Sequence, residues 1–293
     1  MPRPVDVVAS LGHIATRQQL LAAGCSGFDL TSAVRTGELS RVRQGRYATA
    51  LAPFEAVVAV RVGGLLAGPS AANSYGLWHG FDDRVHVSVG ANSSRLRTVR
   101  EPAFADPLVD RMHVPVVVHW LTDGATPELG PECWRVPLLT CLRQTVAWSD
   151  RETGLACLDT ALRLVTRGEI LDAFRDAPTA DRMLAGLCRY GSGSGTESIV
   201  RQRLAAIGIA VNQQVHIPRV GRVDMVVRGT RVVIEVDSKR WHHNPIAFED
   251  DLRRSAELAA QGYTLVRLSY ERVINDWAWC ERMVRAALSS FRR

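Results

Sequence analysis

The stretch that restricts the fold most is GRVDMVVRGTRVVIEVDSKRWH, residues 221–242. It contains two β-branched apolar runs, and the short segment Arg228-Gly229-Thr230 between them is typical of a hairpin connection. Acids interrupt both runs: Asp224 lies in the first, and Glu235 and Asp237 lie in the second. Because side chains two apart in a strand share a face, Glu235, Asp237 and the following Lys239 are predicted to project together from a strand that is otherwise buried.

Carboxylates on adjacent buried strands repel one another unless a positive charge lies between them. A divalent metal is a natural source of that charge, and Mg²⁺ or Mn²⁺ prefers oxygen ligands. We therefore predict a metal site formed by Asp224, Glu235 and Asp237. Such a metal would polarise a phosphodiester and lower the pKa of an attacking water. Lys239 or His242 could then orient the water or stabilise the leaving oxygen.

The residues around this stretch predict the rest of an α/β unit. The segment TESIVRQRLAAIG (196–208) favours a helix capped by Thr196 and ended by Gly208. A second helix is predicted in FEDDLRRSAELAAQG (248–262), followed by the strand YTLVRLS (263–269). Before them, RYGSGSGTES (189–198) alternates Gly and Ser like a flexible joint, so we place a domain boundary there.

The first fifty residues predict helix, turn, helix and a basic hairpin. Thr16 is the expected cap of the first helix, and Gln44-Gly45 is the expected hairpin turn. This order is the winged helix-turn-helix pattern, whose second helix enters a DNA groove while the wing approaches the phosphates. The expected DNA contacts are Arg35, Arg41, Arg43 and Arg46. A small helical cap with a solvated Arg-rich hairpin is the alternative interpretation.

Composition and charge limit the class of protein. In 293 residues there are 46% hydrophobic and 23% charged residues, which is ordinary for a folded globular chain of more than one domain. No apolar run reaches the roughly 18 residues of a membrane span, and the six scattered cysteines form no zinc or disulfide pattern. Positive charge is concentrated at the two ends: +3 over residues 1–50 and +5 over 191–293, against −2 between them. Both end segments are therefore predicted to contact a polyanion.

The C-terminal motifs resemble the PD-(D/E)XK nuclease superfamily, and within it the Vsr-like branch. The resemblance covers residues 190–293 and rests on Glu197 before the strands, Asp224, the run Glu235-Val236-Asp237, and Trp241-His242 after it. It continues through Asp251, Arg254, Leu258, Gly262 and Arg267. It implies a restriction-endonuclease-like core in which Glu197 assists the predicted metal ligands. The expected phosphate contacts are Arg222, Arg240, Arg253 and Arg254.

Two positions depart from the nuclease pattern. Ser238 stands where a glycine is usual, and Asp237 occupies the usual lysine position. Lys239 or His242 could replace that lysine, the site could bind metal weakly, or the fold could serve binding alone. The acids could also form an internal ion-pair cluster with nearby arginines, namely Arg222, Arg240 and Arg254.

The stretch ATRQQLLAAGCSGFDLTSAVRTGELSRVRQGRYA resembles the winged-helix domain of AbiEi-family type IV antitoxins, and the middle segments are similar to that family's continuation. That resemblance implies DNA binding and transcriptional autoregulation. The combined expectation is a multidomain α+β and α/β protein: a winged helix (1–50), a mixed α/β domain (51–188) and a nuclease domain (189–293).

The expected function is a cytoplasmic, nucleoid-associated, Mg²⁺- or Mn²⁺-dependent endonuclease acting on duplex DNA, in mismatch or damage repair or in defence. A homodimer, a cognate toxin or a repair partner is compatible with it. The alternative is an antitoxin-type regulator with an inactive nuclease-like domain. A restriction-like or toxin nuclease would share the same chemistry.

Overall fold

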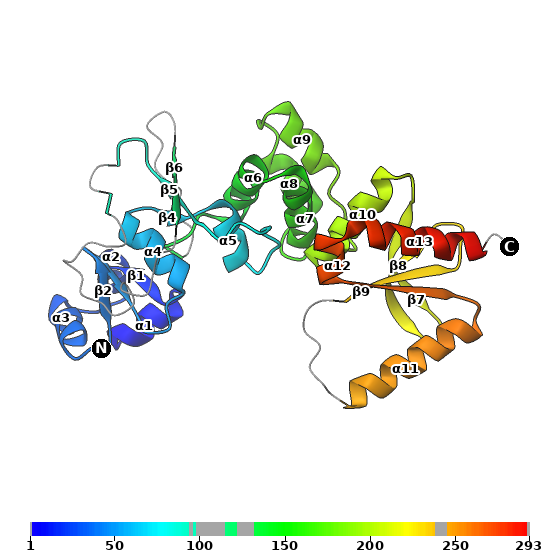
Figure 1. Ribbon diagram of the computed structural model, residues 1–293. Helices are drawn as coiled ribbons and strands as arrows, with labels where there is room; N and C mark the ends of the chain where they lie inside the picture. Colours follow the sequence, from blue (N-terminus) through cyan, green and yellow to red (C-terminus); the bar gives the residue numbers. More distant parts are fainter. Residues whose placement is uncertain (1, 94–95, 98–114, 122–131, 238–244, 292–293) are drawn as a thin grey trace. The chain divides into compact units, whose positions relative to one another are not determined.

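The computed structural model describes residues 2–93, 96–97, 115–121, 132–237 and 245–291 (Figure 1). Its internal contacts divide the chain into two compact units, Met1–Ser149 with Ala173–Ala177, and Asp150–Asp172 with Pro178–Arg293. Helices from both sides of residue 189 pack together within the second unit. The domain limits at residues 50 and 188 stay predictions.

The first unit begins with short helices and a three-stranded antiparallel sheet of order β1-β3-β2. The predicted helices and hairpin are present, and the predicted cap Thr16 forms a capping box with Gln19. Gly45 has a φ of 73°, which a hairpin turn tolerates because glycine has no Cβ. Leu20, Leu30 and Leu39 form the centre of the core. The elements are α1 (Pro4–Ser10), β1 (Ile14–Thr16), α2 (Arg17–Ala22), α3 (Gly27–Arg35), β2 (Ser40–Arg43) and β3 (Arg46–Ala48).

The remainder of the first unit is mixed α and β structure, as the sequence predicted for this segment. Its sheet has the order β4-β5-β6, in which β4 and β5 are antiparallel and β5 and β6 are parallel. All five residues of β5 are buried. The elements are α4 (Phe54–Val62), β4 (Leu65–Leu66), α5 (Gly68–Ser74), β5 (Val85–Val89), β6 (Val116–Trp120) and α6 (Leu138–Trp148).

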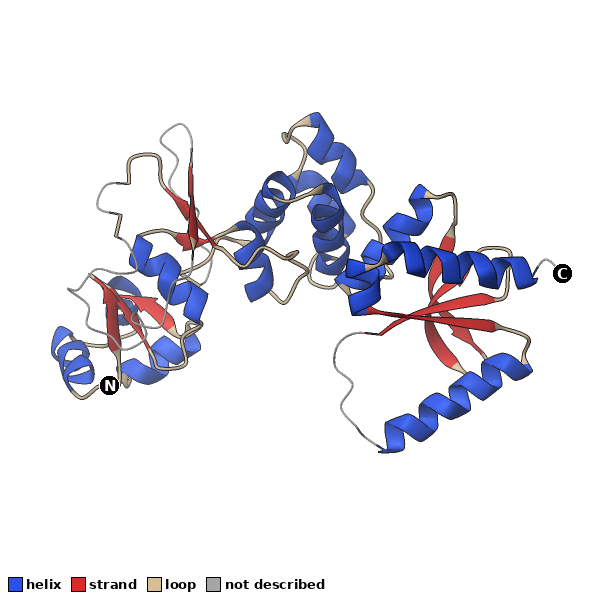
Figure 2. Ribbon diagram, in the orientation of Figure 1, coloured by secondary structure: helices blue, strands red, loops and turns tan. Residues whose placement is uncertain are grey.

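The second unit contains a four-stranded sheet of order β10-β9-β8-β7, drawn in red in Figure 2. Strand β8 is antiparallel to both β7 and β9, and β10 runs parallel to β9. Parallel neighbours need a crossover connection, which α11 supplies. Figure 1 shows α11 on one face of the sheet and α13 on the other. The elements are α7 (Arg151–Ala161), α8 (Arg167–Ala173), α9 (Thr179–Gly186), α10 (Gly195–Ala206), β7 (Val211–Ile217), β8 (Gly221–Val227), β9 (Val232–Asp237), α11 (Pro245–Ala260), β10 (Thr264–Ser269), α12 (Tyr270–Asn275) and α13 (Trp277–Phe291).

The structure corrects the sequence prediction at three places in this unit. The cap of α10 is Ser194, whose side chain accepts from the Glu197 amide, and not Thr196, which is buried one residue inside the helix. The predicted joint therefore includes the first turn of α10. Strand β7 was missed because its sequence VNQQVHI contains three consecutive polar residues, Asn-Gln-Gln, which do not give the alternating apolar pattern of a strand. Helices α12 and α13 were not predicted either.

Candidate functional site

The strands β8 and β9 stop pairing at the position of Asp224. Their register includes Met225 with Ile234 and Val226 with Val233 and goes no further, whereas β9 stays paired with β10 as far as Asp237. The Val236 amide instead donates to Asp224 Oδ2 at 2.9 Å. The Asp224 carboxylate thus takes the place of a backbone acceptor, and the two strands separate around an acidic side chain.

Glu197 is presented by the first turn of α10 and is 7% exposed. Its Oε2 accepts from the Gly193 amide at 2.8 Å and from Gln214 Nε2 at 3.1 Å. Burial raises the pKa of the Glu197 carboxyl, and the negative charge of Asp224 raises it further. The two acids, from a helix and a strand, therefore lie close enough to affect each other.

Gln214 is a site residue that the sequence did not identify. It lies on β7, where the pairing with β8 skips it, and its φ of 50° is in the left-handed region that non-glycine residues rarely adopt. Strained backbone often accompanies functional sites because the surrounding structure must hold it in place. The residue type carried no signal, since a glutamine in a polar strand is unremarkable.

Glu235 lies on β9 directly beside arginines from two other elements. Its Oε1 is 3.0 Å from Arg254 Nη2 on α11, and its Oε2 is 3.6 Å from Arg267 Nε on β10. Burial raises the pKa of the Glu235 carboxyl most, and Asp224 and Asp251 raise it too, while both arginines lower it. The ion-pair alternative raised by the sequence is thus realised at Glu235 through Arg254.

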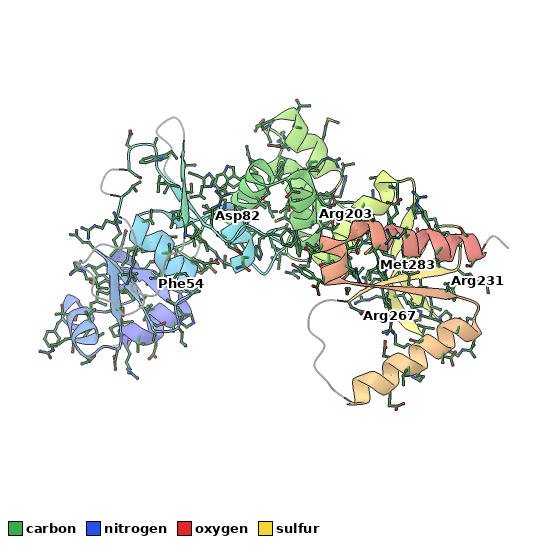
Figure 3. All side chains as sticks on the ribbon, viewed as in Figure 1. Phe54, Asp82, Arg203, Arg231, Arg267 and Met283 are labelled. Atoms are coloured by element: carbon green, nitrogen blue, oxygen red, sulfur yellow. The ribbon has the colours of Figure 1, made fainter. Side chains whose placement is uncertain are left out.

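Asp237 is half-buried at the end of β9 and pairs with Ser269 in the strand register. Its negative charge helps to raise the pKa of Arg267, after the larger contribution of Asp251. Arg267 binds Asp251 through Nη1 at 2.7 Å, so this arginine links α11, β9 and β10 (Figure 3). The other predicted residues of the motif, Lys239, Arg240 and His242, with Ser238 and Trp241, lie outside the described residues.

The arginines predicted to contact DNA fall into two groups. Arg35, Arg41, Arg222 and Arg253 have exposed side chains. Arg43 donates to the Arg61 carbonyl at 2.6 Å, and Arg46 donates to the Cys133 carbonyl at 3.2 Å. These last two are half-buried and satisfy backbone acceptors within the first unit. The wing contact at Arg43 and Arg46 stays a prediction.

The helix that carries Glu197 is anchored by a buried ion pair. Asp159 on α7 accepts at Oδ2 from Ser198 Oγ and from Arg201 Nη2, both at 2.6 Å, and at Oδ1 from the Arg189 amide at 2.9 Å. The Asp159 side chain is fully buried and that of Arg201 is 6% exposed. These contacts fix α10 against α7, and neither residue stood out in the sequence.

Histidines of the first unit form a separate polar chain. His86 Nε2 lies 3.0 Å from Asp82 Oδ2, and His86 Nδ1 lies 3.0 Å from His119 Nε2. The His119 ring stacks on Trp148, and burial, with the charges of His86 and Arg84, lowers the pKa of His119 to about 4. These contacts indicate that His86 and His119 have packing roles. All six cysteines are buried, and none of them forms a disulfide.

Glu197 on α10, Asp224 on β8 and Glu235 on β9 offer carboxylate oxygens, which are the ligands that a hard divalent cation prefers. Within the described residues, however, no group of three or more His, Cys, Asp or Glu side chains has the arrangement of a metal site. In this structure Glu235 is engaged by Arg254, and Asp224 Oδ2 accepts from the Val236 amide.

Comparison with known proteins supports a nuclease-like domain here. The model of the restriction-endonuclease-like family described as REase_MTES_1575 matches residues 197–288, from Glu197 through β8, β9, α11 and β10 into α13. This region is nuclease-like. No curated protein matches the chain. Among the described residues, no helix is long and apolar enough to cross a membrane.

Two solved structures share a distant likeness with the chain. One is the catalytic domain of the homing endonuclease I-Bth0305I, with 20% identity and a TM-score of 0.29 over 33% of this chain and 95% of that one. The other is the RV2827C protein from Mycobacterium tuberculosis, with 17% identity and a TM-score of 0.27 over 68% of this chain and 78% of that one.

The raised pKa of Glu197 makes the folding free energy depend on pH. A carboxyl whose pKa is higher in the folded than in the unfolded chain destabilises the fold as pH rises through that interval. Replacing Glu197 by Gln should therefore raise the unfolding free energy at pH 7 and leave it little changed near pH 4. Urea denaturation of wild type and Glu197→Gln at pH 7 and pH 4 measures the two free energies of unfolding. If the difference between the two proteins were the same at both pH values, the raised pKa of Glu197 would be contradicted.

Proposed function

We propose that the protein is an endonuclease that hydrolyses phosphodiester bonds of duplex DNA with the help of Mg²⁺ or Mn²⁺. The observation that carries the proposal is that Asp224 lies close enough to both Glu197 and Glu235 to raise the pKa of each, within the segment matched by a nuclease family. Asp237 extends the same strand face as Glu235.

In this proposal Asp224 and Glu235 are the principal metal ligands, with Asp237 and Glu197 beside them. A bound divalent metal supplies charge stabilisation at the phosphate and a more acidic attacking water. Asp224 is held for this role by the Val236 amide, and Glu197 is held by the Gly193 amide and Gln214. Lys239 or His242 would complete the site by orienting the water or the scissile phosphate.

DNA binding is proposed to use both ends of the chain. We infer a winged helix over residues 1–50, whose exposed Arg35 and Arg41 contact phosphates, a mixed domain over 51–188, and a nuclease domain over 189–293. In the nuclease domain Arg222, Arg253 and Arg254 would contact the backbone, together with Arg240. These contacts should weaken steeply with salt, because each neutralised phosphate releases counterions.

Cleavage of supercoiled plasmid and of a mismatched duplex tests the proposed activity. With Mg²⁺ or Mn²⁺ the protein should nick or linearise the DNA, and EDTA should stop the reaction. A lack of cleavage on every substrate, with DNA binding that persists in EDTA, would refute the nuclease and leave the binding function.

The N-terminal contacts have a test that does not depend on cleavage. Arg35→Ala and Arg41→Ala should each weaken DNA binding and reduce the slope of log K against log salt by about 1. Arg43→Ala should leave that slope unchanged, because its guanidinium is bonded to the Arg61 carbonyl. Binding of a short duplex, measured by fluorescence anisotropy from low to moderate salt, gives the slopes. An unchanged slope in both exposed-arginine variants would rule out the proposed interface.

A second candidate is a DNA-binding regulator of the antitoxin type whose nuclease-like domain has lost its chemistry. The observation that favours it is the engagement of Glu235 by Arg254 and Arg267, which neutralises a carboxylate that an active site would need. In that case a cognate toxin or another partner protein would be expected, and Glu235→Ala would leave DNA binding unchanged.

A further inference from the structure

Arg254 lies where it can bind either of two anions. Its Nη2 is 3.0 Å from Glu235 Oε1 and also donates to the Arg222 carbonyl at 3.0 Å. Its side chain is 34% exposed, compared with 16% for Glu235. The guanidinium therefore reaches the acidic site from one side and solvent from the other, where a phosphate could approach.

Arg267, the other arginine beside Glu235, is held more firmly. It makes two hydrogen bonds to Asp251 and one to Ser255 Oγ at 3.1 Å. Its Nε is 3.6 Å from Glu235, which is longer than a hydrogen bond. Arg254 makes the direct contact and is the one whose departure would free an oxygen of Glu235.

Two exchanges then compete at one carboxylate. A divalent cation competes with Arg254 for Glu235, and a DNA phosphate competes with Glu235 for Arg254. Arginine binds phosphate and carboxylate through the same fork of N–H donors, so Arg254 would make the same kind of hydrogen bonds after the exchange. A carboxylate released in a partly buried site would in turn need a new positive partner.

Resting on the proposed function, we propose that DNA binding draws Arg254 from Glu235 to a backbone phosphate, so that DNA and a divalent cation bind this site cooperatively. In the DNA-free protein Arg254 occupies Glu235 and keeps the cation affinity low. On DNA, Glu235 joins Asp224 as a ligand. Because coupling between two ligands is reciprocal, the cation must strengthen DNA binding by the same factor. Metal-dependent cleavage would then be confined to the DNA-bound protein.

The matched variants are neighbours on α11. Arg254→Gln removes the contact to Glu235, whereas Arg253→Gln removes the same charge from a residue that bonds the Arg219 carbonyl and lies near Asp250. In the absence of DNA, Mn²⁺ should bind the full-length Arg254→Gln protein about tenfold more tightly than wild type. Arg253→Gln should match wild type, and Arg254→Lys should keep the weaker affinity. Electron paramagnetic resonance of free Mn²⁺ measures the binding, and urea denaturation establishes that each variant is folded.

The coupling itself is measured by adding a short duplex, with a methylphosphonate duplex as the uncharged control. The phosphate duplex, after subtraction of its own Mn²⁺ binding, should tighten Mn²⁺ binding to wild type about tenfold and to Arg254→Gln less than twofold. Equal Mn²⁺ affinity of wild type and Arg254→Gln without DNA would overturn the exchange while leaving the nuclease proposal intact. No Mn²⁺ binding by any variant, with or without DNA, would overturn both.

Discussion

Replacing Asp224 by Asn should slow metal-dependent plasmid cleavage by about 10²- to 10³-fold, the size of effect seen when one charge-stabilising group is removed from an active site. The substitution removes the negative charge but keeps an oxygen that can accept from the Val236 amide, as Asp224 Oδ2 does. The separation of β8 and β9 should therefore persist, and the loss should reflect chemistry at the site.

The control for this experiment is Asp250→Asn, which removes the same charge from an exposed position on α11, 3.6 Å from Arg253. It should cleave at close to the wild-type rate. Single-turnover cleavage by the three proteins, with DNA binding measured in parallel, gives the comparison. If Asp224→Asn cleaved DNA at the wild-type rate, the assignment of Asp224 to the catalytic site would be refuted.

The buried pair Asp159–Arg201 predicts the largest effect on stability. Replacing Asp159 by Ala should destabilise the second unit by about 3 to 5 kcal/mol, because it leaves the buried guanidinium of Arg201 without its carboxylate partner. It also removes the acceptor of Ser198 Oγ and of the Arg189 amide. Since these groups fix α10 against α7, the destabilisation should be concentrated in those two helices.

Hydrogen–deuterium exchange of the intact chain reports this directly, because the two-unit chain need not unfold in one step. Peptides from α7 and α10 should lose protection in Asp159→Ala. Glu281→Ala removes a carboxylate from an exposed pair with Arg285, with 28% and 53% of the side chains exposed, and should change stability by about 0.5 kcal/mol or less. Unchanged protection of α10 in Asp159→Ala would show that the pair does not hold the helix.

The two results also separate the roles of neighbouring residues. Glu197 and Ser198 are adjacent on α10, yet one side chain points to Asp224 and Gln214 and the other to Asp159. A cleavage defect in Asp159→Ala that is accompanied by lost protection of α10 would reflect positioning of Glu197. A defect in Asp224→Asn without such a change would reflect the site itself.

Local sequence determined most of the elements. Thr16 caps α2, and Gly45 and Gly229 mark connections between strands, since a positive φ of 73° or 72° suits glycine. Alternation along residues 232–237 correctly placed Glu235 and Asp237 on one face of a buried strand. These signals depend only on neighbouring residues, so they can be recognised in the sequence without knowledge of the packing. Where the local signal was weak, as in the polar strand β7, the prediction failed.

Only the tertiary structure decided what the acids contact. The sequence held both a metal site and an ion-pair cluster open, because Asp224, Glu235, Arg254 and Arg267 are compatible with either. The packing of α11 and β10 against β9 places two arginines at Glu235, and the register of β8 places Asp224 where the strands separate. Glu235 and Arg254 are 19 positions apart, so their contact depends on how α11 packs against β9. No local sequence pattern predicts such a contact.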